Sequence, residues 1–237
     1  MRIDIITIFP EMFGPLNASI IKRAQVKGIL EIVIWNLRDF SRNKHKKVDD
    51  SPYGGGKGMV LCCEPVFRAV EEIKKQNPKS LTILTSPDGR IFNEKMAKNL
   101  SRKKGLIIIC GHYEGVDERI RTIVDMEISI GDYVLTGGEL PAMVIVDCVA
   151  RLLPGVLPAE SPVHDSFFDS LLDWPCYTRP ANFRGLKVPD VLLSGHHQKI
   201  EQWRYKQSIK RTRQKRPDLY QRYSKTGGRY ASKGSRT

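Results

Sequence analysis

The stretch LIIICGHYEGVDERIRTIVDMEISIGDYVLTGGELPAMVIVDCVARLL, residues 106–153, shows how the chain is organised. Apolar runs at 106–110 and 126–130 are each followed by a glycine-containing turn and then by a helical pattern. Such alternation predicts parallel strands joined by helices, with the turns at the carboxyl ends of the strands. Ligands of open parallel sheets bind at that edge. We therefore expect a pocket formed by the turns 111–115 and 130–138.

The same alternation extends over about the first 150 residues. Further apolar runs at 2–9, 30–37 and 80–87 are followed, at varying distances, by helical patterns. Apolar strands flanked by amphipathic helices predict an α/β fold with a mainly parallel sheet. A third turn, SPDGR at 86–90, is expected to leave the same edge of that sheet.

The turn at 129–143, SIGDYVLTGGELPAM, lacks the residues that a phosphate site needs. It contains no lysine, and Glu139 opens the following helix, where an acid opposes phosphate binding but suits the helix dipole. Its free backbone groups and the apolar Ile130, Val134 and Leu135 suit a flat, uncharged heterocycle such as adenine. A plain strand-to-helix connection is the alternative.

Two common nucleotide-binding motifs are not matched by the sequence. The segment YGGGKGM at 53–59 resembles a P-loop, but that motif requires glycine where Ser51 stands and Ser or Thr where Gly58 stands. No GxGxxG follows a strand, which leaves a dinucleotide site unsupported. The segment is either a surface loop or a backbone-rich loop that closes on a large ligand.

The charge is concentrated at the C-terminal end. The chain has a formal net charge of +13, and residues 196–237 hold 13 Lys and Arg against 2 Asp and Glu. The remaining residues are nearly balanced, with 26 basic and 24 acidic side chains. This distribution predicts a polyanionic partner that is bound by the C-terminal part.

Cysteine usage and hydropathy indicate a protein of the reducing cytoplasm. The five cysteines form no CxxC pair, which argues against disulfides and a zinc site. No apolar run reaches membrane-spanning length, and the N-terminal residues lack the pattern of a signal peptide. We expect no membrane association.

The C-terminal third differs from the rest. Residues 154–190 are rich in proline, glycine and aspartate, and their aromatic side chains favour a functional loop that packs against another element. From residue 196 a helical pattern places Ile200, Trp203 and Gln207 on one face. A compact helical domain is expected there, followed by a flexible basic tail.

A set of motifs then appears in a characteristic order. They are PYGGGKGM, SPDGR, GHYEGVDERI, SIGDYVLTGGELPAM, RLLPGVL, DSFFDSLLDWPCYTRP and GHHQKIEQWRYKQS. In this order they resemble the bacterial tRNA (guanine-N1)-methyltransferases, a family of knotted, SPOUT-class enzymes that use S-adenosylmethionine. The resemblance runs from residue 1 to about 222.

This resemblance implies a fold and an assembly. The expected fold is α/β, a mainly parallel sheet with a deep C-terminal trefoil knot, followed by a smaller all-helical domain. The expected domains are a knotted methyltransferase domain at 1–160, a linker and active-site loop at 161–180, and a basic tRNA-binding domain with its tail at 181–237. The family forms homodimers with active sites at the interface. Magnesium assists in the family, but no motif here predicts its site.

The resemblance also implies a cofactor pocket made by the three turns, largely through backbone groups. The residues expected around S-adenosylmethionine are Leu84, Thr85, Gly111, Tyr113, Glu114, Ser129, Ile130, Gly131, Asp132, Tyr133, Val134, Leu135, Gly137 and Gly138.

The implied substrate is the guanosine immediately 3′ of the tRNA anticodon, position 37, methylated at N1. Family matching assigns the general base to Asp165 and the stabilisation of charge on O6 to Arg151. A free aspartate has a pKa of about 3.9, so proton loss must accompany O6 stabilisation or methyl transfer. Local sequence alone favours a helix cap for Asp165 and a dipole partner for Arg151.

The expected RNA contacts lie mainly in the basic C-terminal domain. Asp50 and the glycine loop resemble the family segment that approaches the target base, whereas phosphate contacts are expected from lysines and arginines. These are Lys206, Lys210, Arg211, Arg213, Lys215 and Arg216.

Two other function classes stay open at this point. Another knotted methyltransferase acting on ribosomal RNA would share the pocket but not the DSF…YTRP block. A non-catalytic RNA-binding protein would need only the basic region. His196 and His197 are expected to be structural, because no carboxylate or cysteine completes a metal site with them.

Overall fold

The computed structural model describes residues 1–158, 165–167 and 169–226. These residues belong to two compact units, one within Met1–Pro158 and the other within Ala159–Thr237. Each unit is described by itself. The basic tail expected after about residue 222 lies, from residue 227 on, outside the described residues.

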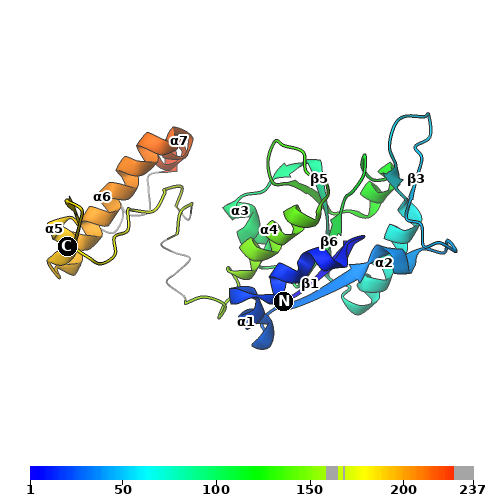
Figure 1. The fold of residues 1–237 in the computed structure, drawn as a ribbon, viewed down its shortest axis with the longest axis horizontal. Helices are drawn as coiled ribbons and strands as arrows, with labels where there is room; N and C mark the ends of the chain where they lie inside the picture. The colour runs from blue at the N-terminus through cyan, green and yellow to red at the C-terminus, as the bar shows by residue number, and fades with distance from the viewer. Residues whose placement is uncertain (159–164, 168, 227–237) are drawn as a thin grey trace. The chain divides into compact units, whose positions relative to one another are not determined.

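A five-stranded parallel sheet forms the centre of the first unit (Figure 1). Its order is β2-β1-β6-β5-β7, and every neighbouring pair is parallel. The strands are β1 (Arg2–Thr7), β2 (Glu31–Asn36), β5 (Ser80–Ile91), β6 (Gly105–Cys110) and β7 (Met126–Ser129). The predicted α/β class with a mainly parallel sheet is confirmed.

Helices cover both faces of this sheet because its central strand is apolar on both sides. In β6, Leu106 and Ile108 pack into one apolar cluster, and Ile107 and Ile109 pack into another on the opposite face. The first cluster includes residues from η1 (Pro10–Asn17), α1 (Ser19–Val26), α3 (Glu94–Leu100) and α4 (Glu139–Ala150). The second includes residues from η2 (Leu37–Phe40), α2 (Cys63–Gln76) and η3 (Glu118–Ile123).

The strand β5 differs from the sequence-based expectation. The SPDGR turn was expected to follow the end of a strand, but β5 continues through it to Ile91. Its register with β7 shifts between Thr85 and Arg90, after which Arg90 pairs with Ile128. The intervening residues therefore form an irregular bulge that leaves the ladder, and a bulge of this kind re-aims side chains at the rim of a sheet.

A small antiparallel pair lies beside the sheet. It consists of β3 (Asp49–Asp50) and β4 (Val60–Leu61), and the glycine segment 53–59 forms the connection between them. The full exposure of the Tyr53 side chain agrees with the prediction of a surface loop at this segment.

The second unit is mainly helical. It contains α5 (Asp190–Leu193), α6 (His197–Lys215) and α7 (Pro217–Thr226), and α6 packs against α7. A short hairpin of β8 (Asn182–Phe183) and β9 (Leu186–Lys187) precedes them, and the sequence pattern did not predict it. The trefoil knot stays a prediction.

Candidate functional site

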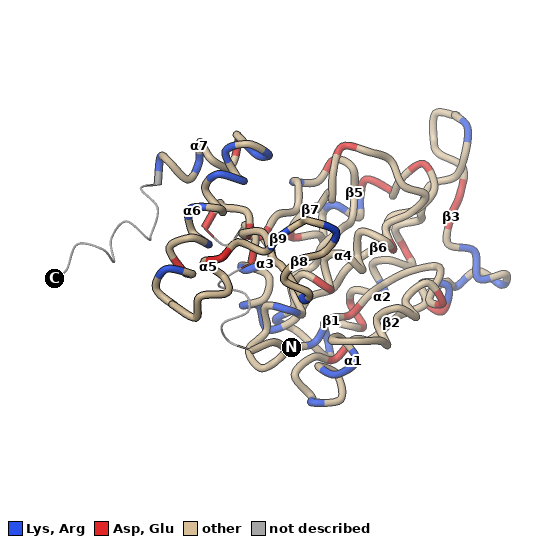
Figure 2. Tube along the Cα trace, turned by 60° about the vertical axis from the view of Figure 1, so that its left-hand side comes forward, with Lys and Arg blue, Asp and Glu red and all other residues tan. Residues whose placement is uncertain are grey.

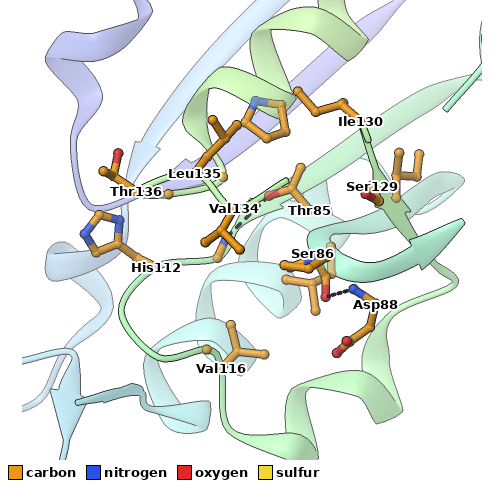
Figure 3. A pocket seen from close by; sticks show the side chains of 18 of the residues that line it. Thr85, Ser86, Asp88, His112, Val116, Ser129, Ile130, Val134, Leu135 and Thr136 are labelled. Carbon is orange, nitrogen blue, oxygen red and sulfur yellow. Dashed lines mark hydrogen bonds between the residues drawn. The ribbon is translucent and has the colours of Figure 1, made fainter. Parts of the chain in front are cut away.

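A cavity of about 400 Å³ lies beside the bulge of β5 and the ends of β6 and β7. Residues of the three turns that the sequence placed at this edge line it, as Figure 3 shows for Ser86, His112 and Val134. Of the residues expected around the cofactor, only Asp132 is not part of the lining, and it is exposed. The structure thus brings the three turns together, while their contacts with a cofactor stay a prediction.

The base of the cavity is made of closely packed backbone. The Gly138 N–H donates to the Gly111 carbonyl at 2.7 Å, and His112 forms an isolated bridge with Gly137. The Gly111 N–H donates a long hydrogen bond to the Thr85 hydroxyl, with 3.4 Å between nitrogen and oxygen. A Cβ on Gly138 would lie 2.0 Å from Thr85 Oγ1 and 2.7 Å from the Gly111 nitrogen, so only glycine fits there.

The turn that follows β7 contributes apolar side chains to this cavity. Ile130, Val134 and Leu135 belong to its lining, and Val134 is 86% exposed. The Tyr133 hydroxyl donates to the Ile130 carbonyl at 3.2 Å, which folds the turn back on itself. Backbone groups and apolar side chains together form a surface suited to a flat heterocycle.

Arg121 joins the rim of the cavity to the sheet, and the sequence analysis missed it. Its guanidinium pairs with Asp88 at 2.8 Å, with Glu118 at 2.9 Å, and with Glu127. The hydrogen bond to Glu127 contributes most to raising the pKa of Arg121 above its ordinary value. This pairing ties the β5 bulge to η3 and β7. No local sequence signal marks it, because Asp88 is far from Arg121 along the chain.

Glu139, the acid that the sequence places at the start of the helix after the glycine turn, is buried. Its side chain is 1% exposed, and it accepts a hydrogen bond from the Thr7 hydroxyl at 2.7 Å. Thr7 is the last residue of β1, at the same edge of the sheet as the cavity. The acid therefore lies inside the protein behind the glycine turn.

The glycine segment between β3 and β4 is attached to the turn 111–115. The Glu114 N–H donates to the Met59 carbonyl at 3.1 Å, and the Leu61 N–H donates to the Gly115 carbonyl at 3.0 Å. Asp50 is exposed at the start of this segment and pairs with Lys47 at 3.1 Å. The backbone N–H of Ser51 and then Lys47 hold the pKa of Asp50 below its ordinary value.

Comparison with known proteins decides the family. The sequence pattern of the family described as "tRNA (Guanine-1)-methyltransferase TrmD" matches residues 1–222. The chain belongs to this family. Its similarity to individual members of the tRNA (guanine-1)-methyltransferases is also high over nearly the full length of both chains.

Three members named tRNA (guanine-N(1)-)-methyltransferase illustrate this similarity. The protein of Dictyoglomus turgidum is 58% identical over 228 residues, 95% of this chain and 92% of its own. The protein of Carboxydothermus hydrogenoformans is 61% identical over 222 residues, 92% of this chain and 87% of its own. The protein of Ruminiclostridium cellulolyticum is 56% identical over 226 residues, 93% and 96% of the two chains.

The two residues that the family resemblance assigns to catalysis lie in different units. Arg151 is the C-cap residue of α4 and is half-buried in the first unit. Asp165 is half-buried in the second unit, and among the described residues no helix begins next to it. The alternative of a helix cap for Asp165 therefore finds no support, whereas Arg151 does stand at a helix C-terminus.

The segment that begins with Asp165 folds into a compact turn attached to α6. The Asp173 N–H donates to the Ser166 hydroxyl at 3.0 Å, and the Leu172 N–H donates to the Thr212 hydroxyl at 2.8 Å. Thr212 is fully buried and donates in turn to the Ser208 carbonyl. Burial, and after it the nearby Asp165 carboxylate, raise the pKa of Asp173.

The predicted RNA-contacting residues on α6 divide into two groups. Lys206, Lys210, Arg213 and Lys215 are exposed, and Figure 2 shows basic residues recurring along this helix. Arg211 is half-buried, and its guanidinium reaches the Asp173 carbonyl at 3.4 Å. Arg216 pairs with Asp218 at 2.7 Å. The first group is therefore the better placed to meet phosphates.

An aromatic cavity of about 540 Å³ lies in the second unit, and the sequence analysis did not predict it. Trp174, Tyr177 and Arg204 belong to its lining. The Arg204 guanidinium lies 5.0 Å from the centre of the Trp174 ring, within range of a cation–π contact.

Two further observations concern metals and membranes. Among the residues that the structure describes, no group of three or more His, Cys, Asp or Glu is placed to hold a metal ion. Within the same residues, no helix combines the length and the hydropathy that crossing a membrane requires. The five cysteines are free thiols.

Proposed function

We propose that this protein transfers a methyl group from S-adenosylmethionine to N1 of the guanosine at position 37 of tRNA, immediately 3′ of the anticodon. The observation that carries the proposal is the cavity built by the turns 86–90, 111–115 and 130–138. These turns lie within the part of the chain that matches the tRNA (guanine-1)-methyltransferase family.

The cavity suits S-adenosylmethionine in size and chemistry. Its volume of about 400 Å³ is within the usual range for small-ligand sites. Glycines at its base bring backbone groups to the surface, and Ile130, Val134 and Leu135 offer an apolar wall. When bound, this cofactor supplies the methyl group from its sulfonium sulfur. The residues proposed to hold it are those named above as its expected contacts.

Asp165 and Arg151 are proposed to act on the guanine. Asp165 accepts the N1 proton while the new N–C bond forms, because a carboxylate is too weak a base to remove that proton beforehand. Arg151 stabilises the negative charge that develops on O6. The turn that carries Asp165 is held by the hydrogen bond from Leu172 to Thr212, which fixes it against α6.

The second unit is proposed to bind the anticodon stem-loop. Exposed Lys206, Lys210 and Arg213 supply phosphate contacts, and Asp50 with its glycine segment approaches the target base. That base must leave the anticodon-loop stack to be methylated.

We further propose a homodimer in the cytoplasm, with each active site at the subunit interface. The five free thiols suit that reducing compartment.

Nucleoside mass spectrometry tests the reaction. The purified protein is incubated with S-adenosylmethionine and unmodified tRNA, and the digested RNA is analysed for 1-methylguanosine. A transcript with adenosine at position 37 is the matched control. We expect 1-methylguanosine only in the first transcript. Methylation of ribosomal RNA alone, or tRNA binding without any transfer, would contradict the proposal.

A substitution tests the role of Asp165. Asp165→Asn should abolish transfer and leave S-adenosylmethionine affinity largely intact, because the amide cannot accept the N1 proton. Asp169→Asn makes the same change in the same turn and should retain most activity. Equal loss of transfer and cofactor affinity in Asp165→Asn would show that Asp165 is structural.

A further inference from the structure

The buried carboxylate of Glu139 is held in a fixed position. One oxygen accepts the Thr7 hydroxyl at 2.7 Å, and that hydroxyl oxygen accepts the Phe9 N–H at 2.9 Å. Glu139 is also the first residue of α4, where the aligned peptide dipoles stabilise negative charge. The fold therefore keeps an acidic group where water does not reach it.

This carboxylate lies directly behind the wall of the cavity. A Cβ on Gly137 would be 2.4 Å from Glu139 Oε2, and Gly137 itself lines the cavity. The same Cβ would be 2.5 Å from His112 Nδ1, so the carboxylate and the imidazole both lie against the backbone of Gly137. A side chain at position 137 would therefore collide with Glu139 and with His112.

The neighbouring His112 makes no hydrogen bond to the acid. His112 Nδ1 lies 3.9 Å from Glu139 Oε2, beyond hydrogen-bond distance, and this buried nitrogen has no hydrogen-bond partner. The Glu139 charge also acts on the buried Cys110 thiol, whose pKa is raised by burial first and by Glu139 second. The field of the carboxylate therefore extends to the end of β6.

The other charges at the cavity are differently placed. Asp88 is exposed at the rim and pairs with Arg121, and Glu114 is exposed on its turn. Solvent screens exposed charges strongly, whereas a buried charge acts through a medium of lower dielectric constant. Of Glu139, Asp88 and Glu114, Glu139 therefore carries the charge that solvent screens least.

We propose that Glu139 is a specificity-determining residue, whose buried negative charge favours the sulfonium form of the cofactor over the thioether left after transfer. The inference rests on the proposed function. Methyl transfer removes the positive charge from sulfur, because the electron pair of the broken S–C bond stays on that atom. A fixed negative charge behind Gly137 therefore stabilises the donor and not the product.

Binding calorimetry on the full chain tests this inference. The affinities of S-adenosylmethionine and S-adenosylhomocysteine are measured for the wild-type protein and for Glu139→Gln, which keeps an oxygen for Thr7 but loses the charge. The ratio of the two affinities should fall about fivefold to tenfold, a change that an ion interaction at moderate effective dielectric constant produces. Glu31→Gln, an exposed site at the other end of the sheet, should leave the ratio unchanged.

Two more variants separate charge from structure. Thr7→Val removes the hydrogen bond but keeps the charge, so it should move both affinities together and preserve their ratio. Glu139→Asp keeps the charge and should restore most of the ratio. An unchanged ratio in folded Glu139→Gln would overturn the inference, whereas binding of neither ligand to the wild-type protein would overturn the proposed function.

A measurement on the wild-type protein remains decisive if Glu139→Gln does not fold. An uncharged isostere of the donor, with carbon in place of the sulfonium sulfur, has the same shape without the charge. It should bind about fivefold more weakly than S-adenosylmethionine, as expected for a charge-dependent interaction. Equal affinities for the two compounds would overturn the inference.

Discussion

The two units of this chain are built by different means. In the first unit β6 is wholly buried, and the cavity at its end is shaped by backbone packed too closely for most side chains. In the described part of the second unit only Ser208, Thr212 and Leu219 are buried, while basic residues stand exposed along α6. A small heterocycle is recognised by shape, and a polyanion is recognised by charge. The comparison therefore predicts that cofactor and RNA binding can be damaged separately.

The largest expected effect is on the shape of the cavity. Gly138→Ala would place a Cβ 2.0 Å from Thr85 Oγ1 and 2.9 Å from the Cys110 Cα. Overpacking of this kind costs about 1–3 kcal/mol of folding free energy. The turn relieves it by moving away from its binding geometry, and a binding cost of the same size corresponds to about a fivefold to 150-fold loss of affinity. Calorimetry should show this loss for S-adenosylmethionine, with tRNA affinity unchanged.

A matched glycine provides the control for this substitution. Gly14→Ala adds the same methyl group where no atom lies within 4 Å, and it should bind the cofactor like the wild-type protein. If Gly138→Ala bound the cofactor normally, the cavity would not be the cofactor site.

The next effect is on the charge of α6. Replacing Lys206, Lys210 and Arg213 together by glutamine should weaken tRNA binding about tenfold. The salt dependence of binding should also fall, because a protein that makes fewer phosphate contacts releases fewer counterions when it binds. Cofactor affinity should stay constant. The measurement is tRNA binding at several salt concentrations.

The control removes the same charge from another surface. Lys22, Arg23 and Lys27 are exposed on or next to α1 in the first unit, and their triple glutamine variant should keep most tRNA affinity. Equal losses in the two triple variants would mean that net charge, and not the position of α6, determines binding.

A smaller effect is expected where the turn that begins with Asp165 meets α6. Thr212→Val leaves the Leu172 N–H without its partner and should lower the free energy of unfolding by about 1 kcal/mol. Urea denaturation checks this value. Thr212→Ser keeps the hydroxyl and should lose less, and identical losses in both variants would assign the effect to the methyl group instead.

The smallest effect concerns Asp173 and depends on pH. Burial and Asp165 raise the pKa of Asp173, so its ionised form is less stable in the folded protein than in the unfolded chain. That cost is present at neutral pH and is relieved as the pH falls through the raised value. Asp173→Asn should therefore be slightly more stable than the wild-type protein at neutral pH.

The advantage of Asp173→Asn should disappear as the pH falls below about 4, where the carboxyl group is protonated in both states. Urea midpoints at the two pH values check this expectation. A stability difference that does not change with pH would mean that the charge of Asp173 plays no part.

How far the sequence predicts this structure depends on the range of each interaction. Apolar periodicity and glycine turns are local, and they predicted the sheet, its helices and the three turns of the cavity. Partners distant in the sequence left no local signal. The Thr7 hydroxyl lies 132 residues from Glu139, and Leu172 lies 40 residues from Thr212. For this reason the burial of Glu139 was not predicted, and the sequence predicted that the loop within 154–190 packs against another element but not that this element is α6.

Hydrogen exchange on the full chain tests the division between the two units most directly. Exchange is measured by mass spectrometry for the protein alone, with S-adenosylmethionine, and with tRNA. We predict that the cofactor slows exchange in the turns 86–90, 111–115 and 130–138 and leaves α6 unchanged, whereas tRNA slows exchange along α6. Protection by the cofactor confined to the second unit, or none at the three turns, would contradict the account.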